Sequence, residues 1–344
     1  MNTTFLKACR GEQTSHVPVW FMRQAGRYLP DYQRVRSKLN FLELCKNPAL
    51  CTEVTLQPVD IFHFDAAILF SDILVPMEAM GLTLEFHEGH GPVFPEPVQS
   101  QQAAEALRIP DPAEDTPFVL ETIRLLRREL KVPLIGFAGA PFTLATYVIE
   151  GGSSRNFYAT KSMMFQRPEL YRLILDKITA CTSSYLIAQA KAGAQALQLF
   201  DSWAGALAPC DYERFALPYV QSILADLRKH TDIPLIYFAN HGATLLRHTS
   251  GLDADVLGID WRIPLADAIR QVGPHAVQGN LDPLALFLPK TELEARIAAM
   301  LEDGKAARGY IFNLGHGVIP ETDPDQVKIA VEAVHRFSSR SKQS

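Results

Sequence analysis

The chain has 344 residues, 47% of them hydrophobic, so it is long enough for one large barrel or two ordinary domains. Its formal net charge of -5 gives no basic footprint for nucleic acid. No apolar run is long enough to cross a bilayer, and the first ten residues lack the apolar centre of a secretion signal. The five cysteines show no Cys-x-x-Cys spacing, which argues against a disulfide framework and a structural zinc site. We therefore expect a cytoplasmic protein with reduced thiols.

Short runs rich in Val, Ile, Leu and Phe recur along the chain, and each is followed by a turn residue and then by helical spacing. The predicted strands are residues 17–22, 66–70, 134–138, 196–200, 235–239, 256–260, 276–279 and 310–314. The predicted helices include residues 116–130, 168–192, 212–229, 264–271, 291–302 and 325–337. Eight alternating units predict a parallel sheet with right-handed crossovers that closes into a single (β/α)8 TIM barrel, an α/β fold.

Residues 81–98 depart from this alternation. Polar and apolar side chains alternate here, and a turn through residues 88–92 predicts a β-hairpin inserted after the second strand. The hairpin is either a flap over the barrel mouth or a decoration that covers an edge or builds an interface. Since no linker interrupts the chain, we expect one domain over residues 1–344, with a polar tail at about 338–344.

The first apolar run ends against two arginines, Arg23 and Arg27, with Gly26 between them. A buried strand that stops at Arg23 would deliver its guanidinium to the mouth of a barrel, and Gly26 would let the backbone bend so that Arg27 points the same way. Guanidinium groups bind carboxylate or phosphate bidentately, so the pair predicts a ligand rich in acidic groups. The alternative is a pair of surface arginines that bridge to Asp31 or Glu43.

The other predicted strands also end in polar residues, which a barrel would gather at one mouth. They are Ser71 and Asp72, residues 139–143, Asp201 and Ser202, Asn240 and His241, Asp260, Asn280 and Asp282, and His316. The carboxylate of Asp72 suits proton transfer or the binding of a developing cation, and its alternative role is to cap a helix or pair with an arginine. His316, between two glycines, either meets a ligand closely or fills a loop. We interpret His241, Asp260 and Asn280 as groups that hold loops together.

Three further features are ambiguous from the residues alone. Tyr147, on a predicted helix, is either a core residue or a phenol near the mouth. Ser202 either donates a hydrogen bond to a ligand or is a turn residue before Trp203. Residues 151–154 resemble a phosphate loop in composition only, because they follow a helix rather than a strand.

Five segments together resemble the uroporphyrinogen decarboxylase family: residues 21–30, which read Phe-Met-Arg-Gln-Ala-Gly-Arg-Tyr-Leu-Pro, and residues 70–74, 136–144, 200–205 and 313–317. The resemblance runs from about Pro18 to Val334. It implies a (β/α)8 barrel, a homodimer, no metal or organic cofactor, and decarboxylation of the four acetate arms of uroporphyrinogen III to give coproporphyrinogen III on the route to haem. Carried over by motif, the residues that bind this tetrapyrrole are Arg23, Gln24, Ala25, Gly26, Arg27, Asp72, Tyr147, Ser202 and His316. Arg36 and Phe41 are expected neighbours, and Trp203 departs from the smaller or more polar residue that we expect there.

The implied chemistry fits the residues. A substrate with eight carboxylates needs the arginines, and its four pyrrole N–H groups converge on a point where Asp72 can accept hydrogen bonds. Protonation of a ring carbon makes a cation that serves as the electron sink, so no cofactor is required, and Asp72 would stabilise that cation. The proton donor is Arg23, a substrate carboxyl group or water, and the sequence leaves these open. Asp72 and Arg23 are thus the expected catalytic residues.

Two other functions share parts of this pattern. A corrinoid or thiol methyltransferase on the same barrel would hold zinc with histidine and cysteine, but no cysteine follows a predicted strand here with a His-x-Cys spacing. A non-catalytic tetrapyrrole carrier would keep the arginines but would not need Asp72.

Overall fold

The computed structural model describes residues 2–87 and 91–339. Seven parallel strands form one curled sheet in the order β1-β4-β5-β6-β7-β8-β9. They are β1 (Ala67–Ile68), β4 (Leu134–Gly139), β5 (Ala196–Asp201), β6 (Leu235–Ala239), β7 (Val256–Gly258), β8 (Ala276–Leu281) and β9 (Tyr310–Leu314). Every residue of these strands except Phe200 is buried, as expected for a parallel sheet that is covered on both faces. The predicted parallel α/β sheet is confirmed.

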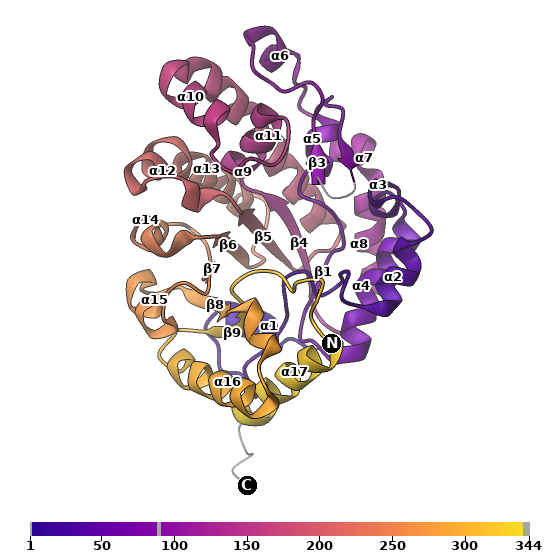
Figure 1. Ribbon diagram of the computed structural model, residues 1–344, viewed down its shortest axis with the longest axis vertical. Helices are drawn as coiled ribbons and strands as arrows, with labels where there is room; N and C mark the ends of the chain where they lie inside the picture. The colour runs from indigo at the N-terminus through magenta and orange to yellow at the C-terminus, as the bar shows by residue number, and fades with distance from the viewer. Residues whose placement is uncertain (1, 88–90, 340–344) are drawn as a thin grey trace.

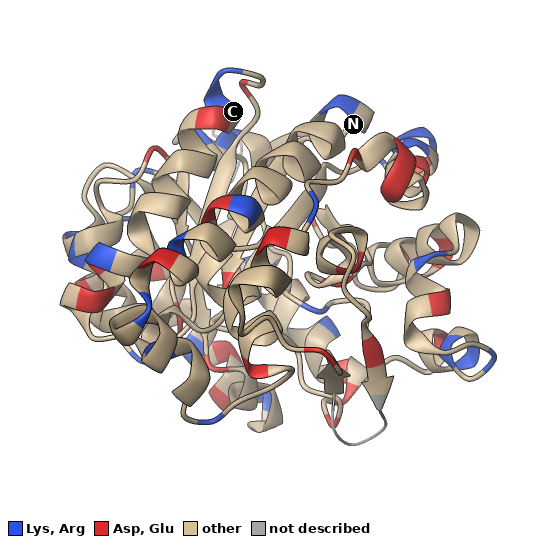
Figure 2. Ribbon diagram, turned by 90° about the horizontal axis from the view of Figure 1, so that it is seen from above, with Lys and Arg blue, Asp and Glu red and all other residues tan. Residues whose placement is uncertain are grey.

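Helices surround the strands (Figure 1). The longest of them are α4 (Pro48–Phe62), α8 (Pro117–Glu129), α11 (Pro168–Ala192), α13 (Leu217–Arg228), α16 (Lys290–Gly304) and α17 (Pro324–Ser338), and α15 (Leu265–Val272) follows β7. Charged residues gather on the helices and loops (Figure 2), whereas the parallel strands carry only Asp201. Within the described ranges, no helix combines the length and the hydropathy that a membrane-spanning segment requires. All five cysteines are free, as predicted, and only Cys210 is exposed.

The predicted helix over residues 212–229 is two helices. These are α12 (Pro209–Phe215) and α13, and the chain turns between them at Ala216, where φ is -127° and ψ is -50°. Pro218 explains the break, because proline lacks the N–H that a helix interior needs but is tolerated in the first turn of a helix. The other predicted helices are confirmed, with their ends shifted by a few residues at most.

The predicted first strand, residues 17–22, is not a strand. Val19 forms only an isolated parallel bridge with Phe312 of β9, and Pro18 has no N–H to donate. Three backbone N–H groups donate to side-chain oxygens instead of to a neighbouring strand: Val19 to Asp65, Phe21 to Gln24 and Met22 to Asn313. The main sheet therefore has seven strands rather than the eight that were predicted.

The same segment still lies between the two edge strands of the sheet. The N–H of Phe312 donates to the oxygen of Pro18 at 2.9 Å, and the N–H of Trp20 donates to the oxygen of Phe312 at 3.4 Å. On the other side, the N–H of Asp65, two residues before β1, donates to the oxygen of Val19 at 2.9 Å. We call residues 18–22 the seam segment, and Arg23 follows it directly.

Two short strands lie outside the main sheet, in the stretch where a hairpin is expected. They are β2 (Glu85–His87) and β3 (Gly91–Val93), and they pair antiparallel. Of the expected turn over residues 88–92, residues 88–90 lie outside the described residues, and residues 91 and 92 belong to β3. Phe86 of β2 packs on Phe41, with ring centroids 4.9 Å apart, and the N–H of Phe94 donates to the oxygen of Gly151 at 2.9 Å. This small sheet thus connects α3 (Phe41–Cys45) to the end of α9 (Pro141–Glu150).

Candidate active site

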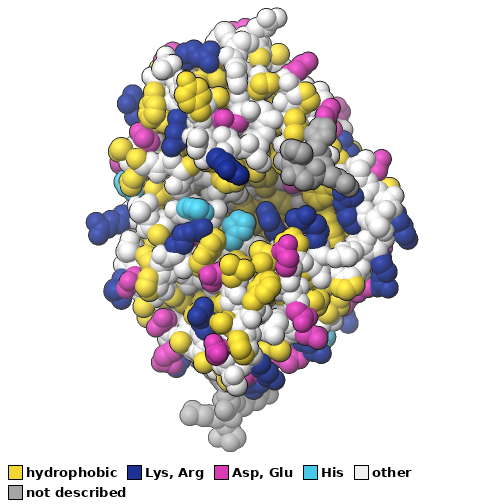
Figure 3. All heavy atoms as spheres, viewed as in Figure 1, with side chains coloured by type: hydrophobic (Ala, Val, Ile, Leu, Met, Phe, Trp, Pro, Cys, Tyr) yellow, Lys and Arg dark blue, Asp and Glu magenta, His cyan; other side chains and the backbone are white. Residues whose placement is uncertain are grey.

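The carboxyl ends of the parallel strands meet at one side of the sheet, and Figure 3 shows a hollow on the face viewed there, with Lys, Arg and His side chains around it. The residue that follows the seam segment is Arg23. Its charge acts on Asp72 after β1, on Tyr147 of α9 and on His316 after β9. The structure therefore brings four of the predicted site residues together from different parts of the chain.

The turn that carries the arginines is built differently from the prediction. Arg23 itself has a left-handed backbone, with φ of 60°, a conformation that is uncommon for a residue other than glycine. Gly26 is not left-handed, but a Cβ atom there would lie 2.9 Å from the carbonyl oxygen of Arg23. Gly26 is thus required for the close approach of two backbone segments, and the bend lies at Arg23.

Both arginine side chains are exposed, and neither forms an ion pair with a residue that the structure describes. The acidic residues that were considered as partners are engaged elsewhere: Asp31 pairs with Arg34, and Glu43 closes a capping box at the start of α3. The interpretation as surface ion pairs to Asp31 or Glu43 is wrong. The guanidinium groups of Arg23 and Arg27 are available to a ligand.

Gln24 supports the turn from inside. Its buried side chain donates to the oxygen of Ala66 and accepts from the N–H of Phe21, both at 3.3 Å. The hydroxyl of Tyr28 donates to the oxygen of Gln24 at 2.7 Å. The N–H of Gln24 donates to the oxygen of Phe21 at 3.0 Å, so both backbone groups of Gln24 are engaged within the protein, whereas Ala25 is partly exposed.

Asp72 is half-buried, and its two carboxylate oxygens differ. One accepts the N–H of Leu74 at 2.8 Å, which confirms the capping role for that oxygen. For the other oxygen we find no hydrogen bond among the described residues. Burial raises the pKa of Asp72, while the Leu74 hydrogen bond and the charge of Arg23 oppose the rise. One face of the carboxylate is left for a ligand.

Tyr147 and Ser202 approach the same region from α9 and from the end of β5. Burial and the charge of Asp72 raise the pKa of the Tyr147 phenol. Trp203 fits without disturbing this arrangement, because its ring packs 6.0 Å from that of Tyr147 and 5.3 Å from that of Phe157, centroid to centroid. Ser202 is half-buried beside it.

Asp201 fixes the end of β5 from the helix side. It accepts hydrogen bonds from the hydroxyls of Thr143 at 2.6 Å and Tyr237 at 2.9 Å, and the hydroxyl of Tyr212 lies 2.9 Å from that of Tyr237. Burial raises the pKa of Asp201 to about 6, although both hydrogen bonds oppose this. The N–H of Trp203 donates to the same Thr143 hydroxyl at 3.1 Å, so this network holds the backbone next to Ser202.

His316 is half-buried in a positive environment. Burial, together with the charges of Arg23, Arg262 and His241, lowers its pKa to about 4. The ring of Trp261 lies 6.3 Å from the His316 ring, centroid to centroid. Sequence analysis missed Trp261 and Arg262, although they directly follow the predicted strand 256–260.

The loop-holding role predicted after β7 and β8 is confirmed for two residues. Asp260 accepts the N–H groups of Gly242 at 2.9 Å and Arg262 at 2.8 Å. Asn280 donates to the oxygen of Asp260 at 2.9 Å. The His241 ring, in contrast, has no hydrogen-bond partner among the described residues.

Two other expectations have structural outcomes. The guanidinium of Arg36 donates to the oxygen of Leu39 in its own loop. Gly151 ends α9 in the left-handed region, with φ of 80°, and Gly152 bridges to Val93 of β3. The glycines of segment 151–154 therefore serve as a helix cap and a strand contact, which explains the composition without a phosphate.

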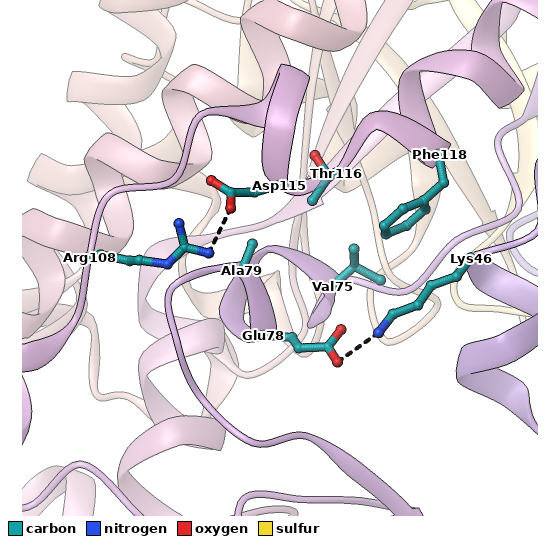
Figure 4. A pocket seen from close by; sticks show the side chains of 8 residues that line it. All are labelled: Lys46, Val75, Glu78, Ala79, Arg108, Asp115, Thr116 and Phe118. Atoms are coloured by element: carbon teal, nitrogen blue, oxygen red, sulfur yellow. Dashed lines mark hydrogen bonds and ion pairs between the residues drawn. The ribbon is translucent and has the colours of Figure 1, made fainter.

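Two hollows differ in their relation to this group. One of about 350 Å³ adjoins it and is lined by Ser154, Arg155, Phe157, Ser202, Trp203, Gly205, Ala206, Asn240 and His241. Another of about 220 Å³ lies beside α5 (Val75–Ala79) and contains none of the predicted site residues. Its charges neutralise each other in the pairs Lys46–Glu78 at 2.7 Å and Arg108–Asp115 at 2.6 Å (Figure 4). We therefore place the candidate site at the group around Arg23, next to the first hollow, whose lining includes Ser202.

A third cluster lies at the amino end of the sheet, because Asp65 precedes β1. The Nε2 atoms of His16 and His335 lie 2.9 and 2.8 Å from the two oxygens of Asp65. Asn2 and the N–H of Val19 also donate to this carboxylate. We call these groups the Asp65 cluster. Sequence analysis missed it because its histidines are 49 and 270 positions from Asp65.

Unpaired arginines beside a half-buried carboxylate, at the carboxyl ends of a parallel sheet, are features expected of an α/β protein whose ligand is an acidic small molecule. The family model described as uroporphyrinogen decarboxylase (URO-D) matches residues 1–337. A uroporphyrinogen decarboxylase of Desulfotalea psychrophila is 64% identical over 340 residues, covering 99% of this chain and 100% of the relative. One of Citrifermentans bemidjiense is 52% identical over 342 residues, with the same coverage. The chain belongs to the uroporphyrinogen decarboxylase family, a family of carboxy-lyase enzymes.

Solved structures show how widely the fold is shared. A methyltransferase from Methanosarcina mazei superposes with a TM-score of 0.81 at 20% identity, covering 98% of each chain. A B12-independent methionine synthase from Shewanella sp. W3-18-1 reaches 0.59 at 10% identity, covering 87% of this chain and 89% of that one. At these identities the likeness concerns the fold alone.

Proposed function

We propose that the protein decarboxylates the four acetate arms of uroporphyrinogen III to methyl groups, giving coproporphyrinogen III. In each step the bond between the methylene carbon and the carboxylate breaks, carbon dioxide leaves, and the methylene carbon gains a proton. The observation that carries this proposal is the meeting of Arg23, Asp72, Tyr147 and His316, in a chain 64% identical to a relative of that name.

The arginines supply the binding of an acidic substrate. Arg23 and Arg27 are exposed and free of described ion pairs, so their planar forks can hold carboxylate arms bidentately. Ser202 and Tyr147 offer hydroxyls, and His316 offers a neutral ring, since its pKa is lowered to about 4. Ala25 and Gly26 contribute through the backbone of the arginine turn, and Gln24 holds that turn in place from the core.

Asp72 and Arg23 take the catalytic roles. The free oxygen of Asp72 accepts pyrrole N–H groups, and its charge stabilises the cation that forms when a ring carbon is protonated. Arg23 favours the ionised form of Asp72, which this role requires. The proton comes from Arg23 or from a substrate carboxyl group or water beside it. The cationic ring then accepts the electron pair of the breaking bond as carbon dioxide leaves, which gives a neutral exocyclic methylene group. That methylene carbon takes up a proton to become the methyl group, and the ring carbon loses the proton it had gained, so the reaction needs no cofactor.

The wider architecture follows the same family. We propose that the seam segment takes the place of the eighth strand and closes a (β/α)8 barrel, since it forms backbone hydrogen bonds with β9 and with the residue that leads into β1. We further propose that residues 1–344 work as one domain and as a cytoplasmic homodimer. Light scattering on the purified protein tests the dimer, and a monomer mass would contradict it.

The deciding experiment is incubation with uroporphyrinogen III under reducing conditions in the dark. Products with seven, six, five and four carboxyl groups are expected in sequence. Binding of uroporphyrinogen III without carbon dioxide release would instead indicate a tetrapyrrole carrier and would contradict the proposal.

A further inference from the structure

The loop after β7 holds an arginine in a defined place. The Cζ atom of Arg262 lies 3.7 Å from the centroid of the Trp261 ring, which is a close cation–π stack. Asp260 fixes the backbone below it by accepting the Arg262 N–H at 2.8 Å. The position of this guanidinium is therefore set by a ring and a backbone hydrogen bond.

Trp261 also connects Arg262 to the candidate site. Its ring centroid lies 6.4 Å from that of His241 and 6.3 Å from that of His316. Next to His316, a Cβ atom at Gly317 would lie 2.5 Å from Cδ of Arg23, so the Arg23 side chain runs directly over this backbone. Arg23, His316, Trp261 and Arg262 thus follow one another along one wall.

The guanidinium of Arg262 is not saturated by the protein. Its acidic partner among the described residues is Asp260, at 3.6 Å, which is too long for a hydrogen bond. The oxygens of Asp260 already accept the N–H groups of Gly242 and Arg262. The Arg262 side chain is 36% exposed, so its donors can reach an external anion. The His241 ring beside it lines the hollow of about 350 Å³.

The positive charge of Arg262 acts on both histidines of this wall. Burial and the charge of Arg262 lower the pKa of His241, against the charge of Asp260, and Arg262 is one of the charges that lower the pKa of His316. An anion placed beside Arg262 would offset this positive charge.

We propose that Arg262, stacked on Trp261, and His241 form a second carboxylate subsite, which holds a substrate arm that is not reacting. The inference rests on the proposed function, because it requires a substrate with several carboxylates. Arg23 acts directly on Asp72, whereas Arg262 stacks on Trp261, whose ring faces His316. The subsite therefore lies beyond His316, away from the Asp72 carboxylate.

A non-reacting arm is held equally in the ground state and the transition state, so losing its contact raises KM and leaves kcat unchanged. In Arg262→Gln we expect KM for uroporphyrinogen III to rise about tenfold or more, as for a lost charge-assisted hydrogen bond, with kcat within about twofold. The KM of Arg262→Lys is expected to lie between those of the wild type and Arg262→Gln, because lysine keeps the charge but loses the bidentate guanidinium. The matched control is Arg270→Gln on α15, an exposed arginine paired with Asp267, whose KM should stay at the wild-type value.

A second readout needs no substrate. NMR titration of the free protein should show a higher pKa for His316 in Arg262→Gln, because one of the positive charges that lower it is removed, and an unchanged pKa in Arg270→Gln. Wild-type protein that fails to decarboxylate uroporphyrinogen III would overturn the proposed function and the subsite together. An active wild type, with Arg262→Gln at the control KM or with an unmoved His316 titration, would overturn the subsite alone.

Discussion

At the scale of single residues, the arginine turn shows how a charge is kept free for a ligand. The strained backbone of Arg23 and the close approach at Gly26 present two guanidinium groups to solvent, while Gln24 anchors the turn in the core. The acidic residues close by in the sequence are engaged with other partners.

Arg27→Ala should raise KM for uroporphyrinogen III more than Arg27→Lys, and lysine should not restore the wild-type value, because a point charge cannot reproduce a bidentate fork. Higher salt should raise the wild-type KM more than it lowers kcat. Arg34→Ala, at an exposed arginine paired with Asp31, is the control. Steady-state kinetics and thermal unfolding check this. An Arg27→Ala protein that unfolds early yet binds substrate normally would show that Arg27 is structural.

Asp72→Asn should keep the fold and substrate binding but lower kcat about 100-fold or more, because the developing cation loses its counter-charge. The amide oxygen of asparagine can still accept the Leu74 N–H. Asp282→Asn is a closely matched control, since Asp282 also follows a strand and accepts the N–H two residues on, at 2.9 Å. Single-turnover measurements test this, and near wild-type turnover in Asp72→Asn would remove the residue from the mechanism.

Residue by residue, the site was predictable where one strand end carries the signal. Arg23 directly follows a predicted strand, Asp72 and His316 each stand two residues after one, and all three meet in the structure. Arg262 was missed because its place near the site depends on two contacts: its stacking on the Trp261 ring, and the packing of that ring near His316. Neither contact is visible in sequence spacing.

At the scale of elements, the Asp65 cluster joins three distant segments: the chain before the seam, the approach to β1 and the last turn of α17. Burial alone would raise the pKa of Asp65, but the hydrogen bonds from His16 and His335 lower it below its ordinary value. The hydrogen bond to Asp65 raises the pKa of His16.

These directions fix the pH window. A lowered carboxylate pKa contributes stability above its ordinary value of 3.8, which is lost as pH falls. A raised histidine pKa contributes stability that is complete below 6.5 and is lost as pH rises through the folded value. Asp65→Asn should therefore lower the free energy of unfolding most between these values, by about 3 kcal/mol, and by less at pH 8. Urea unfolding at pH 5.5 and 8 measures this, with the exposed Asp60→Asn as control. A difference independent of pH would contradict the role of His16.

Elements with strong local periodicity were predictable, and α11 has the predicted bounds, 168–192. The irregular backbone of the seam segment was not predictable, because its N–H groups donate to the side chains of Asp65 and Asn313, which are far away in the sequence. Pro18 also lacks the N–H group that a strand would use. The break at Ala216 was missed because the helical pattern outweighed Pro218.

At the scale of the whole molecule, one fold supports different chemistries. The TM-score of 0.81 to a methyltransferase at 20% identity shows a shared frame, so the reaction must be argued from the residues at the strand ends.

Exhaustive chelation should leave decarboxylation unchanged, since each role assigned here belongs to a side chain or to the substrate. Kinetics before and after dialysis against a chelator check this, with thermal unfolding in parallel to detect any effect at the Asp65 cluster. Turnover lost on chelation and restored by zinc would favour a methyltransferase-like reaction instead.

The seam segment has a consequence for how the protein responds to its substrate. Arg23 directly follows the seam segment, which forms few backbone hydrogen bonds with its neighbours. A ligand that binds Arg23 therefore also restrains the contact between β9 and the residues that lead into β1. By linkage, occupancy of the site should stabilise this contact by an amount that grows with ligand concentration. The amide protons of Val19, Phe21 and Met22 should then slow in hydrogen exchange on binding coproporphyrinogen III, more than those on the outer helices. Hydrogen exchange at these three amides would thus report whether the site is occupied.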